Sequence, residues 1–513
     1  MRKKMWLASM LAAFLLTAGT VQAQSVSDKI SALEQELQQL KEQQIDLKKE
    51  ATAAAAAMPS FSYRPGNGVE IEAADKAWGL RFTVESHFRY NFEEGRDQTG
   101  RTNGQLMGRR FRPGVFYCLN NCLWEIEATL DLDGWGTGNG KNNQATGVGS
   151  MLQRGAVNFH GENISPWLPT VQFGMEVQNA SGNSLSRQGS GSTGAQMEYD
   201  LLSRNNGFNT GRAGSGFTLN WDDRSLSAIG IPGRIGRFQF GMSTIAEGDD
   251  GTQVMSDRQS FNVYGNIQPF SQVKNKWISG LTFEGGTWFC NNDTRDPSAS
   301  SGSAVCLERF RIQDHGDGGR MTLFDTGADS VGKGLATAIG TGIVWNVGPY
   351  TARIAGSWLQ AHDQGGEAGK KRAHDFLIGH DLYLWSPKGW LTGSATTTGS
   401  VLIGTHFERT DISSSCTKNV NCGGNANSLI NQFTRNRILL REWDIWYFIA
   451  PRMSIGLNVL WYDASNLGNR TNQAGYQVGK CNKVGVGTTT GTDCRVGVGG
   501  DWLTSALNWR YTF

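Results

Sequence analysis

Beyond its first residues, the 513-residue chain has no apolar run long enough to cross a membrane as a helix. Such a crossing takes about 18 or more consecutive apolar residues. The chain also lacks the HExxH, GxSxG and P-loop signatures, and it has no CxxC or CxxCH pattern. These absences argue against a helical membrane protein, against the common hydrolases and nucleotide-binding enzymes, and against covalently bound haem.

Weak matches to site motifs lack the context that the chemistry needs. Gly189–Gly194 fits GxGxxG, but no buried strand precedes it and no helical pattern follows it, so a flexible loop is expected. The seven histidines are scattered, at positions 87, 160, 315, 362, 374, 380 and 406. The sequence therefore predicts no catalytic residues, no metal site and no cofactor.

Neither sign of charge is in large excess. The formal net charge is +2, and removing the three basic residues at the N-terminus leaves −1. This balance argues against a nucleic-acid partner. The chain has 67 glycines, 10% aromatic residues and a mean hydropathy of −0.39. Low hydropathy with many aromatic residues is typical of strands that are apolar on only one face.

The N-terminus predicts export from the cytoplasm. Three basic residues at 2–4 precede an apolar stretch at 5–16, and a cleavage site follows at 21–23. This is the pattern of a secretory signal peptide over residues 1–23. We expect the mature chain to begin at Gln24, with an uncleaved membrane anchor as the alternative.

Residues 24–57 are expected to form a periplasmic coiled-coil helix that runs into a linker. Apolar residues recur at heptad a and d positions: Val26, Ile30, Leu33, Leu37, Leu40 and Leu47. Gln44 is a polar residue at an a position. A single amphipathic helix lying on another surface is the alternative. Residues 58–77, with Pro and Gly at their start, are expected to be a linker.

The rest of the chain, 78–513, predicts strands with one apolar and one polar face. Apolar and polar residues alternate over 80–92, 124–133, 237–242, 453–461 and 507–513. The last segment places Leu507, Trp509 and Phe513 on one face, as in the closing strand of an outer-membrane barrel. Any single segment could belong to a soluble sandwich, whereas their repetition favours a transmembrane barrel.

Short and long connections alternate along these strands. Short turns are expected at 119–121, 347–349, 386–389 and 450–452, and long loops at 133–150, 176–215, 290–335, 411–435 and 464–500. Outer-membrane barrels have short periplasmic turns and longer external loops, and their strand number is even. The predicted fold class is therefore all-β, a transmembrane antiparallel β-barrel of about 16 strands, in the range of about 16–18.

Eight cysteines fall into four local pairs: Cys118/Cys122, Cys290/Cys306, Cys416/Cys422 and Cys481/Cys494. An even number in nearby pairs favours disulfides in an exported chain. Metal binding is the weaker alternative, because the spacings fit no metal motif. Each ring would be short, so each would stiffen a connection more than it would stabilise the barrel.

Three segments resemble the phosphate-selective porins O and P. Met107–Arg112, with its Arg-Arg-Phe-Arg sequence, resembles the second strand of that family, Trp124–Glu127 follows it, and Trp385–Gly389 looks like a related turn. The resemblance implies a homotrimer of barrels, each with its own pore. It also implies that the loop 176–215 folds inward and that arginines and lysines attract anions such as phosphate.

On the cleaner strands, the water-facing positions carry both signs of charge. The expected pore-lining residues are Arg81, Glu85, Arg89, Arg110, Arg112, Glu125, Glu127, Asp131, Arg237 and Arg510. The candidates for a constriction in the inward loop are Arg187, Arg204, Arg212, Glu198 and Asp200. A ring of one sign would set selectivity, whereas balanced charges could simply solvate the lumen.

Three functions remain open on the sequence. The first is a bacterial outer-membrane porin, a homotrimer in lipid that passes small solutes or ions and is inserted by assembly machinery that reads its C-terminal strand. The second is a barrel that sheathes a partner, such as a multihaem cytochrome in an electron conduit. The third is a barrel enzyme, which needs a nucleophile and a histidine that no spacing selects. The sequence favours the porin, without catalysis.

Overall fold

A computed structural model describes residues 26–93, 103–130, 132, 152–177, 213–226, 230, 232–247, 254–291, 311–313, 322–325, 335–361, 371–414, 436–463 and 501–512. The predicted signal peptide and most of the expected long loops lie outside these ranges. The chain divides into two compact units. One is Met1–Pro59 with Ala73–Asp75, and the other is Ser60–Glu72 with Lys76–Phe513.

The first unit contains α2, a single helix of 32 residues over Val26–Ala57. Its sequence is rich in Leu, Lys, Glu, Gln and Ala, the residues with the highest helix propensity. The a and d leucines at 33, 37, 40 and 47 are all more than half exposed. No helix among the described residues is long and apolar enough to cross a membrane. The N-terminal helix is confirmed, and its association with other copies stays a prediction.

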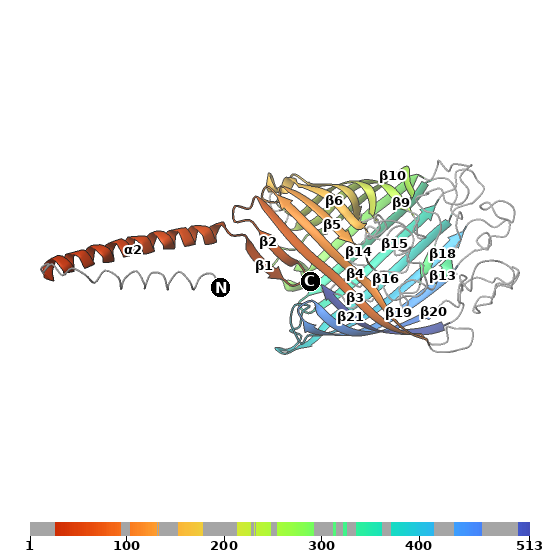
Figure 1. The fold of residues 1–513 in the computed structure, drawn as a ribbon. Helices are drawn as coiled ribbons and strands as arrows, with labels where there is room; N and C mark the ends of the chain where they lie inside the picture. The colour runs from red at the N-terminus through yellow and green to blue at the C-terminus, as the bar shows by residue number, and fades with distance from the viewer. Residues whose placement is uncertain are drawn as a thin grey trace, which may run out of the picture. The chain divides into compact units, whose positions relative to one another are not determined.

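The second unit is a closed antiparallel β-barrel (Figure 1). Its sheet holds 19 strands, of which β1, β2 and β17 stand outside the ring, leaving sixteen. The ring consists of β3 (Trp78–Glu93), β4 (Asn103–Leu119), β5 (Trp124–Leu130), β6 (Leu152–His160), β7 (Thr170–Val177), β8 (Ala213–Ser225), β9 (Arg234–Glu247), β10 (Val254–Gln268), β11 (Leu281–Asn291), β14 (Leu335–Val347), β15 (Tyr350–Ala361), β16 (Lys371–Ser386), β18 (Val401–Ser414), β19 (Asn436–Ala450), β20 (Met453–Asp463) and β21 (Asp501–Thr512).

Pairing of the last ring strand with the first closes the barrel. β21 runs antiparallel to β3 from Thr504 opposite Glu93 to Thr512 opposite Glu85. Every other ring strand pairs with the ring strands before and after it in the chain. In the sequence between β11 and β14, β12 (Arg311–Gln313) and β13 (Thr322–Asp325) form a small hairpin that is separate from the ring. The predicted fold class, strand number included, is confirmed.

Residues 60–72, expected to be part of a linker, instead form a hairpin that extends the barrel wall. β1 (Ser60–Arg64) pairs with β2 (Gly68–Glu72), and β2 pairs with β3 from Val69 opposite Phe82 to Glu72 opposite Gly79. The hairpin therefore uses the part of the β3 edge that β21 leaves unpaired. It lies at the same end of the barrel as the end of β21 (Figure 1).

The seven short connections lie at the end of the barrel that carries this hairpin, at 120–123, 161–169, 226–233, 269–280, 348–349, 387–400 and 451–452. The turn expected at 386–389 is only the start of its connection. After β16, Gly389–Trp390 (β17) folds back so that Trp390 pairs with Trp385, and the chain then continues to Val401. A short helix, α3 (Lys276–Ser279), lies in the connection before β11 and is capped by Asn275, whose side chain accepts from the Trp277 N–H.

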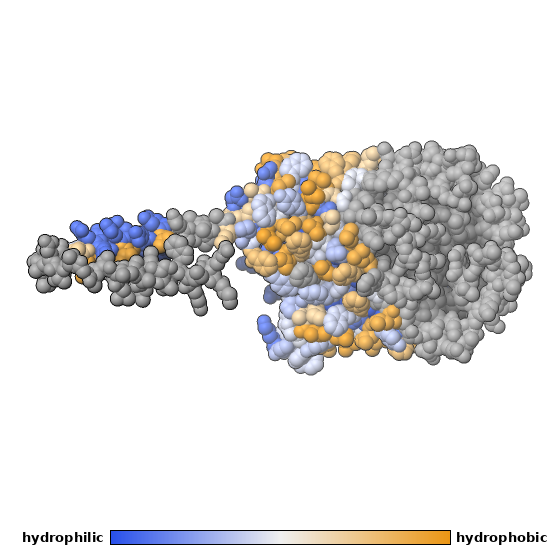
Figure 2. Space-filling model, in the orientation of Figure 1, coloured by the Kyte–Doolittle hydropathy of each residue, from blue (hydrophilic) through white to orange (hydrophobic). Residues whose placement is uncertain are grey.

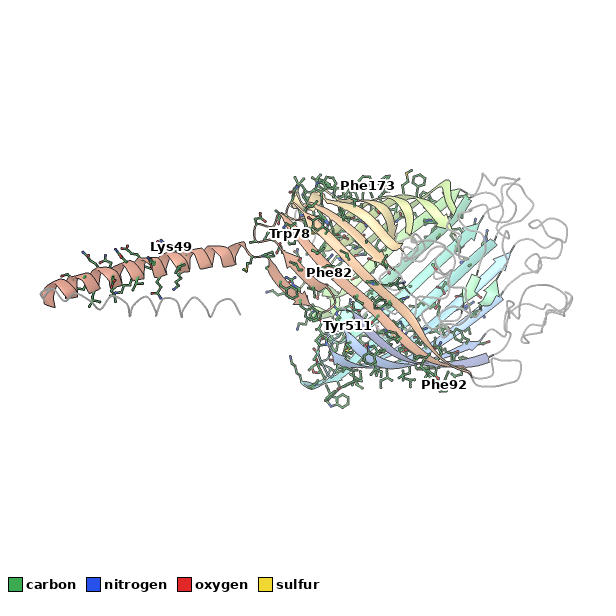
Figure 3. All side chains as sticks on the ribbon, viewed as in Figure 1. Lys49, Trp78, Phe82, Phe92, Phe173 and Tyr511 are labelled. Carbon is green, nitrogen blue, oxygen red and sulfur yellow. A yellow bond between two sulfur atoms is a disulfide. The ribbon has the colours of Figure 1, made fainter. Side chains whose placement is uncertain are left out.

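Most outward side chains of the barrel are apolar, and its inner face carries most of the buried polar and charged side chains. Along β3, His87, Arg89 and Asn91 are buried, while Phe88 and Phe92, which alternate with them, are about half exposed. Figure 3 shows Phe92 and Phe173 projecting from the outer surface, and Figure 2 shows hydrophobic residues gathered on that surface. A water-soluble barrel would bury these aromatic rings. The distribution is the one expected when lipid surrounds the barrel.

Large inward side chains lie against glycines on the neighbouring strand. A Cβ at Gly456 would stand 2.2 Å from the Trp446 ring, and one at Gly379 would stand 2.6 Å from the His406 ring. Both pairs are cross-strand neighbours, Trp446 with Gly456 and His406 with Gly379. Because these rings lie flat on the wall, they are buried by lateral packing.

We expect Gly456→Ala to destabilise the folded barrel by roughly 1–3 kcal/mol, because the new methyl group overlaps the Trp446 ring. Gly285→Ala is a matched control, since its methyl group would meet its nearest neighbour, the Gly340 carbonyl oxygen, at 3.6 Å. The urea midpoint of the compact form on unboiled gels measures the difference. Equal midpoints for the two variants would contradict the packing described above.

Candidate functional site

The described pore-lining candidates sit at inward positions of their strands. Arg89, Arg110, Glu127 and Arg510 are buried on the inner face. Arg81, Glu85, Arg112 and Glu125 are half-buried, and Arg237 is exposed near the start of β9. Asp131 and the five constriction candidates, Arg187, Arg204, Arg212, Glu198 and Asp200, lie outside the described residues. That these side chains line a channel stays a prediction.

Asn508 is the centre of a polar network on the inner face. Its side-chain oxygen accepts a hydrogen bond from Arg89 Nε at 2.8 Å and lies 2.7 Å from His87 Nε2. Its amide nitrogen donates to Asn458 Oδ1 at 2.7 Å. Arg89 and His87 lie on β3, and Asn458 lies on β20. Side-chain hydrogen bonds therefore join the strands on both sides of the closing strand β21.

The network continues from β20 into β19 and β18. Asn458 donates to the Asp444 carboxylate and, at 3.4 Å, to Glu442 Oε1. His406 Nδ1 lies 3.0 Å from Asp444 Oδ2. All four side chains are buried. Charged groups of this kind need partners when they are removed from water, and here the partners come from adjacent strands.

Arg353 and Asp381 end the network on β15 and β16. The two side chains form an ion pair. Arg353 Nη1 lies 3.5 Å from His406 Nε2, and Asp381 Oδ1 lies 3.4 Å from the same nitrogen. The network thus runs from β15 through the closing strand to β3.

Other predicted pore-lining residues are paired in the same layer. Glu85 forms ion pairs with Arg110 at 3.5 Å and Arg112 at 3.7 Å, all on β3 and β4. Two further contacts involve Glu127, which accepts from Gln172 at 2.9 Å, and Arg237, which pairs with Asp222 at 2.7 Å.

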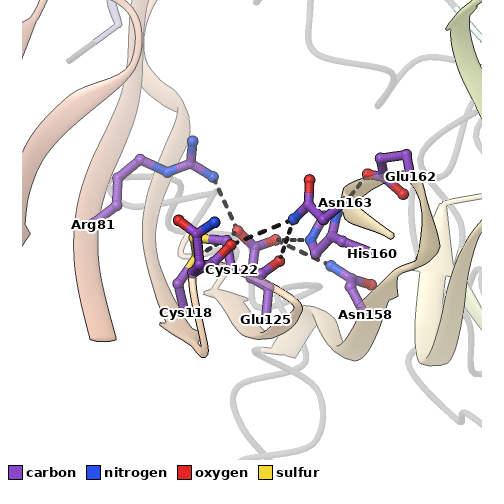
Figure 4. The surroundings of a disulfide bond; sticks show 9 residues. Arg81, Cys118, Cys122, Glu125, Asn158, His160, Glu162 and Asn163 are labelled. Carbon is purple, nitrogen blue, oxygen red and sulfur yellow. Dashed lines mark hydrogen bonds and ion pairs between the residues drawn. A yellow bond between two sulfur atoms is a disulfide. The ribbon is translucent and has the colours of Figure 1, made fainter. Parts of the chain in front are cut away.

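A smaller cluster surrounds Glu125 at the end with the short turns (Figure 4). Its carboxylate lies 3.6 Å from Arg81 Nη2, accepts from Asn158 Nδ2 at 3.1 Å, and lies 4.0 Å from His160 Nε2. Cys118 Sγ is 3.7 Å away. The cluster draws its members from β3, β4, β5 and β6 and holds these strand ends together.

Glu162, in the turn after β6, is the second acid of this cluster. Its carboxylate lies 2.8 Å from His160 Nδ1 and accepts from the Thr170 hydroxyl at 2.7 Å. Burial alone would raise the pKa of Glu162, but hydrogen bonds from His160 and Thr170 lower it below its ordinary value. The carboxylate is therefore held in its charged form at this mouth of the barrel.

One of the four expected disulfides lies in the described part of the chain. Cys118 and Cys122 are bonded across the turn between β4 and β5, as expected. Asn120, Asn121 and Cys122 all have φ between 51° and 56°, and Asn163 donates to the Cys122 carbonyl oxygen at 3.0 Å. Cys290 belongs to β11, but its side chain, together with Cys306, Cys416, Cys422, Cys481 and Cys494, lies outside the described structure.

An apolar cluster occupies the inner face near the connection 387–400. Ala395 of this connection packs with Leu402, Trp446 and Phe448, and Tyr383 packs against them. The connection is anchored by backbone hydrogen bonds, from Gly399 N–H to the Phe448 carbonyl oxygen at 2.7 Å among others. The Arg510 guanidinium lies 3.6 Å above the Trp446 ring. This cluster borders the polar network.

Sequence reasoning missed the part of the network on β15, β16 and β19. Arg353, Asp381, Glu442 and Asp444 are all buried there. On β16 the inward face carries apolar Leu377, while His374 and His380 face outward. Polar and apolar residues therefore do not alternate along this strand, and its inward face cannot be recognised from the sequence. The alternation of Glu442 and Asp444 with Trp443 and Ile445 was the available signal.

Tryptophans gather at the end with the short turns. Trp167, Trp277 and Trp390 lie in or beside the connections there and are each more than half exposed. The Trp345 indole donates to the Trp277 carbonyl oxygen at 2.7 Å, and Trp221 donates to Trp167 at 3.0 Å. Outer-membrane barrels carry such aromatic girdles at the membrane–water interface.

No protein-family profile and no curated protein matches the chain. Among solved structures, it is similar to OmpF of Salmonella typhi, with 10% identity over 88% of this chain and 100% of that chain and a TM-score of 0.45. It is also similar to OmpT of Vibrio cholerae (10% identity, 85% and 98% covered, TM-score 0.44) and to the outer membrane channel DcaP of Acinetobacter baumannii (9%, 85% and 98%, TM-score 0.42). The resemblance to phosphate-selective porins stays a prediction.

We expect Asn508→Ala to destabilise the barrel by roughly 1–3 kcal/mol, because it removes the buried hydrogen bonds to Arg89 and Asn458. Asn163→Ala is the control: it removes two hydrogen bonds, to the Asn121 and Cys122 carbonyl oxygens, that are exposed at the turn, and its cost should stay below about 1 kcal/mol. Urea unfolding in detergent compares the two. A smaller cost for Asn508→Ala than for Asn163→Ala would contradict the role of the network.

Proposed function

We propose that the chain forms a bacterial outer-membrane porin, a channel for passive diffusion of small solutes or ions. One observation carries the proposal: a closed ring of sixteen strands has aromatic and aliphatic side chains on its outer surface and charged side chains on its inner surface. The outer surface fits lipid, and the inner surface fits water and solutes. The aromatic girdle supports the same orientation in a membrane.

The size of the ring supports an open lumen. Barrels of about 16–18 strands are wide enough to leave an aqueous channel, whereas barrels of about 8 strands are filled by their own side chains. In this barrel, the large inward rings of His406 and Trp446 lie over Gly379 and Gly456. Side chains that lie along the wall occupy less of the centre. Both features favour passage through the barrel.

The described inner wall does not support the anion preference that the resemblance implies. Its buried arginines are Arg89, Arg110, Arg353 and Arg510. Its buried carboxylates are Glu127, Glu284, Asp375, Asp381, Glu408, Glu442 and Asp444. Because carboxylates exceed arginines in this layer, we propose a channel that favours cations weakly. This replaces the phosphate preference as our expectation.

We also propose that the chain is a homotrimer assembled in part through α2. The helix presents Leu33, Leu37, Leu40 and Leu47 to solvent at heptad spacing. Three or four heptads associate weakly alone, but helices tethered to associated barrels act at high effective concentration. Packing the leucines against those of other copies would remove them from water and so stabilise the association.

The remaining partners follow from the same placement. Lipid covers the outer aromatic surface, the alternating closing strand β21 is the segment offered to the assembly machinery, and no catalytic step is needed. A sheath around a multihaem cytochrome is the second candidate, although no observation in the described chain favours it. Haem that co-purifies with the protein would support that alternative.

In planar bilayers, the purified protein should insert in groups of three conductance steps and pass potassium more readily than chloride. The reversal potential in a KCl gradient measures the preference, and its physical basis is the excess of inner carboxylates. Heat-unfolded protein is the control for contaminating channels. Absence of conductance from folded protein would refute the porin, and a chloride preference would refute the selectivity proposal alone.

The double substitution Leu37→Asp with Leu40→Asp should shift the protein from trimer toward monomer in mild detergent, because charge replaces the apolar seam of α2. Gln38→Asp with Gln39→Asp is a matched control that adds the same charge on the other faces of the same helix turn. Light scattering of the full chain gives the mass. The trimer proposal fails if the unsubstituted protein is already a monomer, and the role of the helix fails if both variants remain trimers.

A further inference from the structure

Three buried side chains with metal-ligand chemistry converge on the inner face of the barrel. His406 lies on β18 directly opposite Glu442 on β19, and Asp444 lies two residues further along β19 on the same face. One ligand atom from each lies within 4.8 Å of the others. The His406 ring rests over Gly379 on β16, which leaves space for it against the wall.

The contacts among these three side chains favour a bound cation between them. His406 Nδ1 and Asp444 Oδ2 are 3.0 Å apart, yet neither atom takes part in a hydrogen bond, and both are buried. One carboxylate oxygen of Asp444 also lies within 4.8 Å of one of Glu442. Two buried carboxylates repel at such a distance unless a cation or a proton lies between them.

The neighbouring residues orient the triad. Asn458 donates to both carboxylates and fixes two of their oxygens. Arg353 is engaged by Asp381, and Arg510 lies over the Trp446 ring. With Asp381, the group holds three carboxylates against these two arginines. The group therefore carries a formal net charge of −1, which favours a bound cation.

We propose that His406, Glu442 and Asp444 form a binding site for a divalent transition-metal cation, with zinc as the probe. Imidazole nitrogen suits zinc and its neighbours better than magnesium or calcium. Zinc bonds to nitrogen and carboxylate oxygen are about 2.0–2.2 Å long. Ligand atoms bound to one zinc at these lengths lie about 3–4 Å apart, and the three candidate atoms here lie within 4.8 Å of one another. Asn458 acts as a positioning residue that supports both carboxylates.

A bound cation would change the charge of the inner wall. It adds +2 beside β18 and β19, where carboxylates prevail. If the barrel conducts ions as proposed, zinc should shift the reversal potential in the direction of greater chloride permeability. This expectation rests on the proposed channel, whereas the metal site does not. If zinc binds as proposed and the potential does not move, the assignment of this wall to the conduction path fails and the metal site stands.

The test measures zinc in the full-length protein, either refolded with ZnCl₂ or exposed to it after folding, then passed through a desalting column. We expect one zinc per chain in the unsubstituted protein. His406→Gln and Asp444→Asn should weaken binding about tenfold or more. His87→Gln is the matched control, because His87 is another buried inward histidine but lies on β3, outside the triad. Unboiled gels show that each variant is folded.

X-ray absorption at the zinc edge of the unsubstituted protein keeps the proposal testable if a variant does not fold. The spectrum should show one imidazole with oxygen ligands and no sulfur. No zinc in the unsubstituted protein, a sulfur ligand, or full binding by folded His406→Gln would each overturn the proposal.

Discussion

The requirement that every backbone N–H and C=O group be paired inside lipid determines this structure. A strand in hydrocarbon has no water to satisfy its edge, so the sheet is stable there only as a ring, and the pairing of β21 with β3 completes it. Closure fixes which face of each strand points inward. Leu507 and Trp509 then meet lipid, while Asn508 and Arg510, which alternate with them, must find partners inside. The inner network follows from the closure.

The size of its cross-strand neighbour determines how much room an inward side chain has on the inner wall. Two large inward rings have a glycine as cross-strand neighbour: Gly379 lies beside His406 and Gly456 lies beside Trp446. The side chain can then lie along the sheet and reach polar groups on the next strands. The same arrangement brings His406, Glu442 and Asp444 close enough to share one positive charge. Packing and electrostatics on the inner wall are therefore linked.

The sequence predicted the faces of strands whose two sides differ in polarity. Arg89 and Arg510 were placed inside because aromatic residues flank them on β3 and β21. The same reasoning failed on β16 and β19, where inward Leu377 and Trp446 are apolar and outward His374 is polar. Cross-strand register depends on turns and closure, so no periodicity could place Asp381 near His406. The hairpin in residues 60–72 was missed because its turn residues at Pro65–Gly68 resemble those of a linker.

The hairpin β1–β2 shares one edge of β3 with the closing strand. β2 pairs with this edge of β3 as far as Phe82, and β21 pairs with the same edge from Glu85 onward. The two segments therefore stand end to end along β3. The hairpin is synthesised early in the chain, whereas β21 is synthesised last. A seam occupied in this way works as a mechanical stop: the last strand cannot slide further down β3 without displacing β2. Since a slip of one residue would turn lipid-facing side chains inward, the hairpin limits how far the closing strand can slip in that direction.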